Sequence, residues 1–233
     1  MKQIISMFNI SIWRKLLLFI FVSFSLLFSL SAQSVEKAFV NMPDEYYLSL
    51  PTAQRKEMVK AYKKDTTAIS KNRFRGQSSI LLIDSINQFM SIQNTINSKV
   101  ALKILKNGTP NASIYYALIF TACAPVCDSH IGFYNADWSF LKNSLLPKIT
   151  ILDFLDTDKI QADGKKVESV AEQFDIVFIQ THFVDNGSNI EATLNSEKFM
   201  DKDSFTRLRT YLKGDKILFT WENTTFKKTN CHW

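Results

Sequence analysis

The stretch YYALIFTACAPVCDSHIGFYNADW, residues 115–138, decides the fold that we predict for this chain. It contains two of the three cysteines, and β-forming and aromatic residues lie on both sides of the short segment Ala124–Val126. Such runs on either side of a turn that contains proline are typical of a β-hairpin. The stretch therefore predicts two strands folded back on a short loop, with Cys123 and Cys127 at its two sides.

The residues before this hairpin predict more strands of the same sheet. Runs rich in β-formers occupy residues 79–83, 88–96, 99–105 and 113–121, and Asp-Ser, Asn-Ser and Asn-Gly-Thr-Pro segments separate them. Connections this short suit hairpins, because parallel pairing requires longer crossovers. We therefore expect an antiparallel meander from residue 78 to residue 133.

One helix is predicted to cover the apolar face of this meander. Pro51 suits the first turn of a helix, where its missing N–H costs nothing. Met58, Val59 and Tyr62 form a narrow apolar stripe, and we expect Arg55 and the lysines at positions 56, 60, 63 and 64 to face water.

The second half of the chain predicts a smaller layer of the same kind. Residues 145–155 are expected to begin extended and end as a short helix, and residues 156–164 form a polar loop. Strands are predicted at 174–184, 190–194 and 217–221. Between the last two, residues 201–213 predict a helix with Asp201 or Asp203 as its N-cap, apolar residues Phe205, Leu208 and Leu212 turned inward, and Gly214 beyond its end.

These patterns predict an α+β fold with antiparallel β-sheet layers, each covered by a short helix. The arrangement is similar to a tandem of PepSY-like or β-lactamase-inhibitor-like domains, which is an analogy of fold only. We place the helix and meander in residues 33–140 and the second layer in residues 141–233. One continuous domain is the alternative.

The first 32 residues predict a secretory signal peptide. Lys2, Arg14 and Lys15 precede the apolar run 16–30, and small residues before Gln33 suit cleavage. The run has 15 residues, fewer than the roughly 20 that cross a bilayer as a helix. Removing the leader lowers the net charge from +6 to +3, so a nucleic-acid partner has little support. We expect an exported protein without a membrane span, in the periplasm or at the outside of a Gram-negative cell.

Three stretches resemble a known family. They are AFVNMPDEYYLSLP (residues 38–51), CAPVCDSHIGFYNADW (residues 123–138) and DKDSFTRLRTYLKGDKILFTWENTTF (residues 201–226). The chain resembles the secreted Bacteroidales proteins catalogued as domain of unknown function 3256 (DUF3256). The resemblance implies export and an α+β fold, and it carries over no active site.

The cysteines allow two interpretations. In an exported protein, Cys123 and Cys127 are candidates for a disulfide across the hairpin. Because such a bond closes only a small ring, we expect it to stabilise the folded protein by about 1–2 kcal/mol. The alternative is a thiol-redox or metal-handling site, since the segment is similar to the Cys-x3-Cys of thioredoxin-like copper-delivery proteins. That chemistry requires a helix to start at the pair. A zinc set of Cys123, Cys127 and His130, with Cys231 or His232, is a further form of the alternative.

No residue is nominated as catalytic, and no cofactor is predicted. The sequence lacks a G-x-S-x-G elbow, an H-E-x-x-H motif and an EF-hand loop. His182 occurs alone in a predicted strand, where a packed or half-exposed side chain is the commoner case. A hydrolase with an unmarked site is the weakest hypothesis.

The aromatic residues raise the hypothesis of a sugar-stacking surface, although most are expected in the core. The candidates are Trp138, Trp221, Trp233, Tyr115, Tyr116 and Tyr134. Our leading prediction is an exported, non-enzymatic binding or interaction protein whose partner is a protein, a peptide or a glycan. The alternative is a periplasmic redox or metal-handling protein that uses Cys123 and Cys127.

Overall fold

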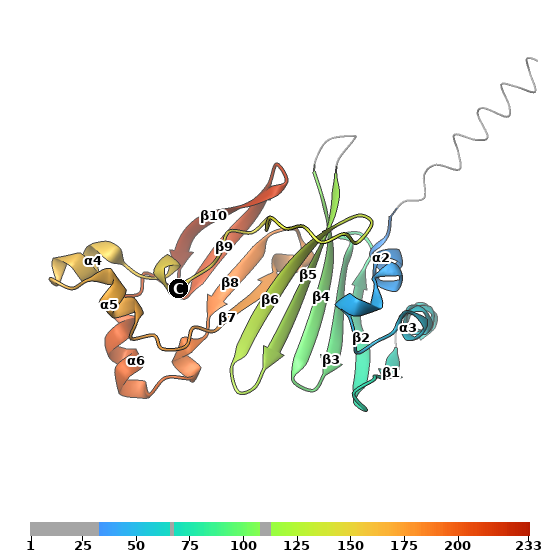
Figure 1. The fold of residues 1–233 in the computed structure, drawn as a ribbon, viewed down its shortest axis with the longest axis horizontal. Coiled ribbons are helices and arrows are strands. Elements are labelled where there is room, and N and C mark those ends of the chain that lie inside the picture. Colours follow the sequence, from blue (N-terminus) through green and yellow to red (C-terminus); the bar gives the residue numbers. More distant parts are fainter. Residues whose placement is uncertain (1–32, 66–67, 108–112) are drawn as a thin grey trace, which may run out of the picture. The chain divides into compact units, whose positions relative to one another are not determined.

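A computed structural model describes residues 33–65, 68–107 and 113–233, and the described residues from Ser34 to Trp233 belong to one compact unit. The predicted leader, residues 1–32, lies outside the described residues. Two antiparallel sheets and several short helices make up the unit (Figure 1), which confirms the predicted α+β class. The likeness to tandem PepSY-like domains stays a prediction.

The first sheet is a six-stranded antiparallel meander, as predicted, and strands that follow one another in the chain are neighbours in the sheet. Its strands are β1 (Ile69–Lys71), β2 (Gln77–Asp84), β3 (Phe89–Thr95), β4 (Ser98–Lys106), β5 (Ile114–Cys123) and β6 (Cys127–Asn135). The four predicted runs before the turn coincide with β2 to β5. β1 was not predicted, because three residues are too few to show a period of two.

Two helices, rather than the one expected, cover one face of this sheet: α2 (Val35–Asn41) and α3 (Thr52–Asp65). Ser34 caps α2, since its hydroxyl accepts a hydrogen bond from the Lys37 N–H. Phe39 of α2 and Met58 of α3 belong to a buried cluster with apolar residues of the sheet. The sheet contributes Ile80, Met90, Ile92, Val100, Leu102, Ile104, Tyr116, Leu118 and Tyr134 to that cluster.

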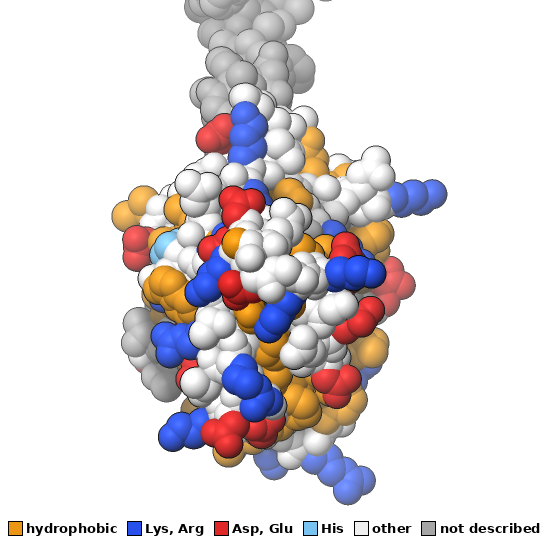
Figure 2. Space-filling model, turned by 90° about the vertical axis from the view of Figure 1, so that its left-hand side faces the viewer, with side chains coloured by type: hydrophobic (Ala, Val, Ile, Leu, Met, Phe, Trp, Pro, Cys, Tyr) orange, Lys and Arg blue, Asp and Glu red, His pale blue; other side chains and the backbone are white. Residues whose placement is uncertain are grey.

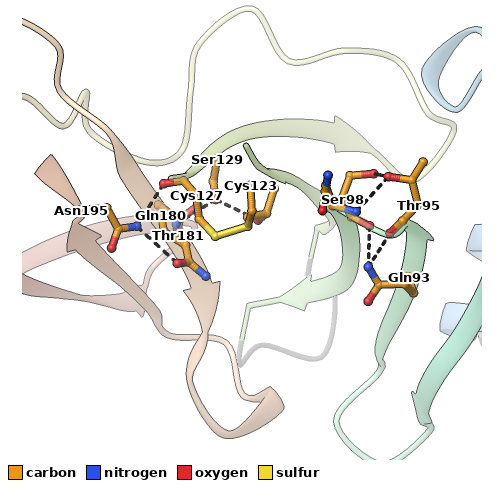
Figure 3. Close-up of a disulfide and its surroundings, with 11 residues drawn as sticks. Gln93, Thr95, Ser98, Cys123, Cys127, Ser129, Gln180, Thr181 and Asn195 are labelled. Atoms are coloured by element: carbon orange, nitrogen blue, oxygen red, sulfur yellow. Dashed lines mark hydrogen bonds between the residues drawn. A yellow bond between two sulfur atoms is a disulfide. The ribbon is translucent and has the colours of Figure 1, made fainter. Parts of the chain in front are cut away.

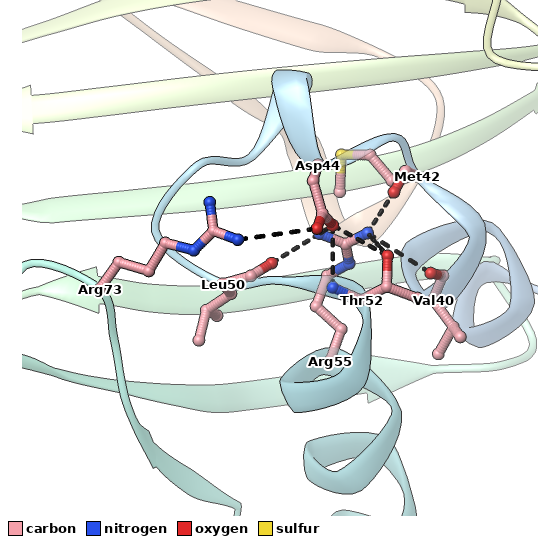
Figure 4. Close-up of polar contacts among 7 residues, drawn as sticks. All are labelled: Val40, Met42, Asp44, Leu50, Thr52, Arg55 and Arg73. Atoms are coloured by element: carbon pink, nitrogen blue, oxygen red, sulfur yellow. Dashed lines mark hydrogen bonds and ion pairs between the residues drawn. The ribbon is translucent and has the colours of Figure 1, made fainter.

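Arg55 corrects a prediction, because it is fully buried and does not face water. Its guanidinium donates to the carbonyl oxygens of Leu50, at 2.6 Å, and Met42, and its Nη1 lies 3.2 Å from Asp44 Oδ1 (Figure 4). The chain between α2 and α3, which includes the one-turn helix η1 (Asp44–Tyr46), folds over the start of α3. The buried carbonyl groups of this segment need hydrogen-bond donors, and Arg55 provides them. The helical pattern of α3 does not reveal this need, because the carbonyl groups belong to another part of the chain.

The second sheet has four antiparallel strands in the order β10-β9-β8-β7. They are β7 (Ile179–Phe183), β8 (Ile190–Leu194), β9 (Lys216–Glu222) and β10 (Thr225–His232). β8 has the predicted bounds, and β7 begins five residues later than the prediction of a strand from Phe174. β10 was not predicted: it pairs only with β9, and an edge strand with mostly exposed side chains carries no apolar alternation.

Helices accompany the second sheet as well. They are α4 (Thr157–Ala162), α5 (Val167–Ala171) and α6 (Lys202–Arg209), with one-turn helices η2 (Ile151–Asp153), η3 (Val184–Asn186) and η4 (Ser196–Lys198). α6 has the predicted Asp201 cap and buries Phe205 and Leu208. The prediction of a polar loop at 156–164 was wrong, because these residues contain α4. Asp156 caps the helix, and Ile160, its one buried residue, is fully buried.

One hydrophobic cluster includes residues of both sheets, so the core continues across the predicted boundary at residue 140. Ring centroids of Phe89 and Phe183 lie 6.1 Å apart, and those of Phe133 and Phe226 lie 5.9 Å apart. Each pair joins the first sheet to the second. The division into two domains stays a prediction.

A buried lysine also links the two sheets. Lys103 of β4 is 3 % exposed, and its Nζ donates to the carbonyl oxygens of Asn87 and, at 2.9 Å, Asn186. Asn87 lies in the turn between β2 and β3, and Asn186 ends η3 after β7. Loss of hydration lowers the pKa of Lys103 to about 8, against a weaker opposing effect of Asp84.

Candidate binding cleft beside the disulfide

The structure contains the predicted disulfide between Cys123 and Cys127. The two residues lie directly opposite each other in the β5–β6 ladder, with Cα atoms 3.9 Å apart, and a cis peptide bond joins Ala124 to Pro125 in the turn. Residues in a closely spaced antiparallel pair bring their Cβ atoms within the reach of a disulfide. The bond therefore ties the end of the hairpin together.

The geometry counts against the redox and metal alternatives. β6 begins at Cys127, so the pair lacks the helix start that a thioredoxin-like site requires. Successive side chains of a strand point to opposite faces, which separates His130 from Cys127. Within the part of the chain that the structure describes, no three His, Cys, Asp or Glu side chains gather into a possible metal site.

Cys231, the third cysteine, lies in β10 as a free, half-buried thiol opposite Ile217. Burial raises the pKa of its thiol, which makes it less reactive at neutral pH. His182 is half exposed, as expected, and its Nε2 lies 3.9 Å from Glu191 Oε1 on β8. Cysteines and histidines therefore form no metal-ligating group within the described residues.

A cleft of about 350 Å³ lies beside the disulfide, between β7 and the face of the first sheet that is turned away from α2 and α3. Polar residues of four strands and the disulfide itself line it (Figure 3). The lining residues that carry the argument below are Ser91, Gln93, Lys99, Thr121, Gln180 and His182.

The floor of the cleft changes from apolar to polar along each strand. On β5, buried Ala117 and Ile119 are followed on the same face by Thr121. On β3, buried Phe89 is followed by half-buried Ser91. The second sheet covers the apolar part, and the polar part begins where that cover ends. These polar positions therefore line an open cleft instead of filling the core.

Hydrogen bonds from the hairpin hold β7 in place as a wall of the cleft. The Thr181 N–H donates to Ser129 Oγ at 3.0 Å, and that hydroxyl lies 2.8 Å from Thr121 Oγ1. Asn195, just after β8, donates from Nδ2 to the Cys127 carbonyl at 3.0 Å and to Gln180 Oε1 at 3.3 Å. Figure 3 shows both sets of contacts around the disulfide. The disulfide-tied hairpin is thus hydrogen-bonded to the β7 side of the second sheet.

One polar atom at this wall lacks a partner. Thr181 is 5 % exposed, and its hydroxyl makes no hydrogen bond to any residue in the described ranges. A buried hydroxyl without a partner is unfavourable by about 1–3 kcal/mol, so such a group calls for an explanation. Thr181 lines this cleft and also a second cavity of about 440 Å³, whose other lining residues include Ile131, Leu146 and Ile149.

Of the six aromatic residues considered for sugar stacking, three are buried, two are partly buried against the core, and Trp233 is exposed. Tyr116, Tyr134 and Trp138 are buried together, with the Tyr116 and Trp138 ring centroids 4.6 Å apart. Trp221 packs against Tyr115 and donates from Nε1 to the Lys106 carbonyl. Their burial agrees with the expectation that most of these rings belong to the core.

Sequence reasoning found the disulfide and missed the cleft. Its residues belong to strands separated by up to about ninety positions, and no single segment contains a motif. The available signal is a polar residue at a strand position whose neighbours two residues away are apolar, as at Thr121.

The fold and the site together define an α+β protein in which a disulfide-tied hairpin joins two antiparallel sheets beside a polar cleft. No helix in the described ranges has both the length and the apolar character needed to cross a bilayer. Residues 27–226 match the family described as "Protein of unknown function (DUF3256)", and the chain belongs to this family.

A solved structure with the same fold is a domain of an uncharacterized protein from Porphyromonas gingivalis W83. The two share 17 % sequence identity with a TM-score of 0.69, over 84 % of this chain and 97 % of that one. At this level of identity the likeness concerns the fold alone. A search of curated proteins finds no match to this chain.

Proposed function

We propose that this chain is an exported, non-enzymatic binding protein whose disulfide cleft holds a small ligand rich in hydrogen-bonding groups, such as part of a glycan or a short peptide. The observation that carries the proposal is the polar floor of the cleft, formed by Ser91, Gln93 and Thr121. On the same face of the same strands, the residues that the second sheet covers are apolar. Pockets with a few convergent polar groups are the usual place for small ligands.

The charges near the cleft are few. Lys99 is exposed on its floor, and His182 and Lys216 both lie within 4 Å of Glu191. At the end of the unit that carries α4, α5 and α6, basic and acidic side chains are interspersed (Figure 2). A nucleic-acid backbone is therefore not part of the proposal, since such partners are bound through concentrated positive charge.

Export is supported by the disulfide, which persists in oxidising compartments, and by the predicted leader. The periplasm or the outside of the cell provides such conditions. The absence of a catalytic motif in the sequence is the reason for proposing binding and not catalysis.

Saturation-transfer NMR with a panel of monosaccharides and end-blocked dipeptides tests the proposal. Ala101 lies on the cleft floor, so Ala101→Trp fills the space and should abolish the signal of any ligand that binds there. The matched control is Ala122→Trp, at an exposed position on the opposite face of the sheet, which should leave the signal unchanged. A ligand signal that survives in Ala101→Trp would place binding elsewhere and contradict the proposal.

A further inference from the structure

Three connecting segments meet at one end of the first sheet (Figure 1). They are the loop 47–51 before α3, the β1–β2 turn 72–76 and the β3–β4 turn 96–97. The two turns lie at the same end because alternate turns of an antiparallel meander do so.

Hydrogen bonds join the three segments to one another. The Arg73 N–H donates to the Ser49 carbonyl at 3.0 Å, and the Ser49 hydroxyl donates to Asn94 Oδ1 at 2.6 Å. Asn72, which is buried, donates from Nδ2 to the Asn94 carbonyl at 3.1 Å and accepts at Oδ1 from the Phe74 N–H at 3.0 Å. These bonds hold the loop and the two turns in a fixed arrangement.

Each of the three segments presents one large apolar side chain to solvent. Leu48 is 57 % exposed, Phe74 is 66 % exposed and Ile96 is 93 % exposed. We call these three side chains the apolar tips. A single exposed apolar residue needs no explanation, but several on neighbouring segments mark an interaction surface for a protein or a membrane.

The β1–β2 turn adds positive charge to this surface. Three exposed basic residues lie within three positions of Phe74 in the chain, and they are Lys71, Arg73 and Arg75. In the neighbouring loop, Asp44 lies 3.2 Å from the buried Arg55 and 4.0 Å from Arg73, so its charge is compensated. Glu45 is exposed beside it, and the surface keeps an excess of positive charge.

We propose that this end of the first sheet docks on an anionic lipid bilayer, with the apolar tips inserted at the level of the headgroups and the three basic side chains bound to lipid phosphates. Exposed apolar side chains together with neighbouring basic residues are what binding to an anionic bilayer surface requires. Arginine suits the phosphate contacts, because its guanidinium matches phosphate oxygens with two parallel N–H groups.

The shape of the surface favours a bilayer over a protein partner. The apolar tips stand on separate segments, and a bilayer accepts isolated side chains. A stable protein complex needs a continuous contact area of roughly 800 Å² on each partner. Ile96 also borders the cleft beside the disulfide, but docking on lipid does not depend on a ligand in that cleft.

Co-sedimentation with lipid vesicles tests the proposal. The protein begins at Gln33, since an uncleaved apolar leader would itself bind lipid, and the described residues from Ser34 form one compact unit. One set of vesicles is phosphatidylcholine alone, and the other contains about 30 % phosphatidylglycerol. We expect binding to be at least about tenfold tighter on the anionic vesicles and to weaken as salt rises from about 50 to 300 mM.

Two exposed isoleucines at opposite ends of the sheet provide a matched pair. Ile86 is 95 % exposed in the β2–β3 turn, which follows Asp84 and contains no lysine or arginine. We expect Ile96→Ser to weaken binding to anionic vesicles about fivefold, because an inserted apolar side chain is lost. Ile86→Ser should leave binding unchanged.

The basic residues have a matched pair of double variants. Lys71→Gln/Arg75→Gln should weaken binding at least about tenfold at low salt, since each cation near an anionic surface contributes to affinity. Lys166→Gln/Lys202→Gln removes the same charge from exposed positions beside the second sheet, and it should have little effect.

Any of four results would overturn the proposal. The first is no binding to the anionic vesicles, and the second is an equal effect of Ile86→Ser and Ile96→Ser. The third is self-association in sedimentation velocity that Phe74→Ser abolishes, which would identify a second copy of the chain as the occupant. The fourth is loss of vesicle binding in Ala101→Trp, which fills the cleft and should leave docking on lipid unchanged.

Discussion

At the scale of single residues, two buried cations, Arg55 and Lys103, donate hydrogen bonds to backbone carbonyl groups of the segments that connect helices and strands. Arg55 donates hydrogen bonds to the carbonyl groups of Met42 and Leu50, which both lie in the segment 42–51 between α2 and α3. Lys103 collects carbonyl groups of two turns from different sheets. In both cases the donors satisfy backbone oxygens that have left water, so the role of each residue depends on tertiary structure.

Replacing Arg55 by methionine should destabilise the protein by about 2–4 kcal/mol, because buried carbonyl groups of Met42 and Leu50 lose their donor. Urea unfolding followed by fluorescence measures the change in free energy. Lys56→Met on the exposed side of α3 is the control and should change stability by less than about 0.5 kcal/mol. Equal effects of the two substitutions would contradict the assigned role of Arg55.

Lys103 should make stability rise with pH above neutrality. Its pKa is about 8 in the folded protein and 10.5 in an unfolded chain, so the unfolded state binds more protons between these values. The free energy of unfolding should therefore increase from pH 8 to pH 10.5, by at most about 3 kcal/mol from this group. Lys103→Met should remove this part of the pH dependence in parallel urea titrations. An identical pH dependence in both proteins would refute the assignment.

At the scale of the elements, the sequence predicted the helices and strands whose ends and turns are determined by residues close together in the chain. The β5–β6 hairpin, its disulfide, the strand at 190–194 and the helix capped by Asp201 all have signals within a few residues. β10 and α4 escaped prediction, since β10 is a polar edge strand and α4 buries a single apolar side chain.

The cleft escaped prediction for a different reason. Its floor and wall come from β3, β5 and β7, and only the packing of one sheet on the other places Ser91, Thr121 and Gln180 in one site. Strand alternation predicts which face a residue occupies, and it does not predict where on that face a second layer ends.

The double variant Cys123→Ser/Cys127→Ser should lose about 1–2 kcal/mol of stability, because the disulfide closes only a small ring. Urea unfolding with and without reductant measures this difference. The reductant should destabilise the unaltered protein by the same amount and leave the double variant unchanged. Cys231→Ser, which removes the free thiol, should retain the response to reductant. A response in the double variant would show that another disulfide exists.

At the scale of the whole molecule, the described unit depends on one shared core. Phe133 of the first sheet contacts Phe226 of the last strand, and Phe89 contacts Phe183. Because both sheets contribute to the same cluster, neither half contains all the contacts that bury its own apolar face. The sequence patterns do not reveal that the two sheets share a core, because they show only two successive runs of strands and helices.

Intact mass spectrometry of the protein recovered from its own host tests the prediction of export. We expect a chain that starts at Gln33, with one thiol that reacts with an alkylating reagent before reduction and three that react afterwards. Retention of residues 1–32 would contradict cleavage of the leader. Three reactive thiols before reduction would contradict the disulfide and make the redox interpretation the leading one.

The short separation of Cys123 and Cys127 also determines how the bond is made. The pair is 4 residues apart, whereas Cys231 is about a hundred residues from either partner. Since the entropic cost of closing a loop grows with its length, an unfolded chain meets the correct pair more often than a wrong one. An emerging chain can therefore acquire its correct bond before the sheets have formed, with little need for later isomerisation.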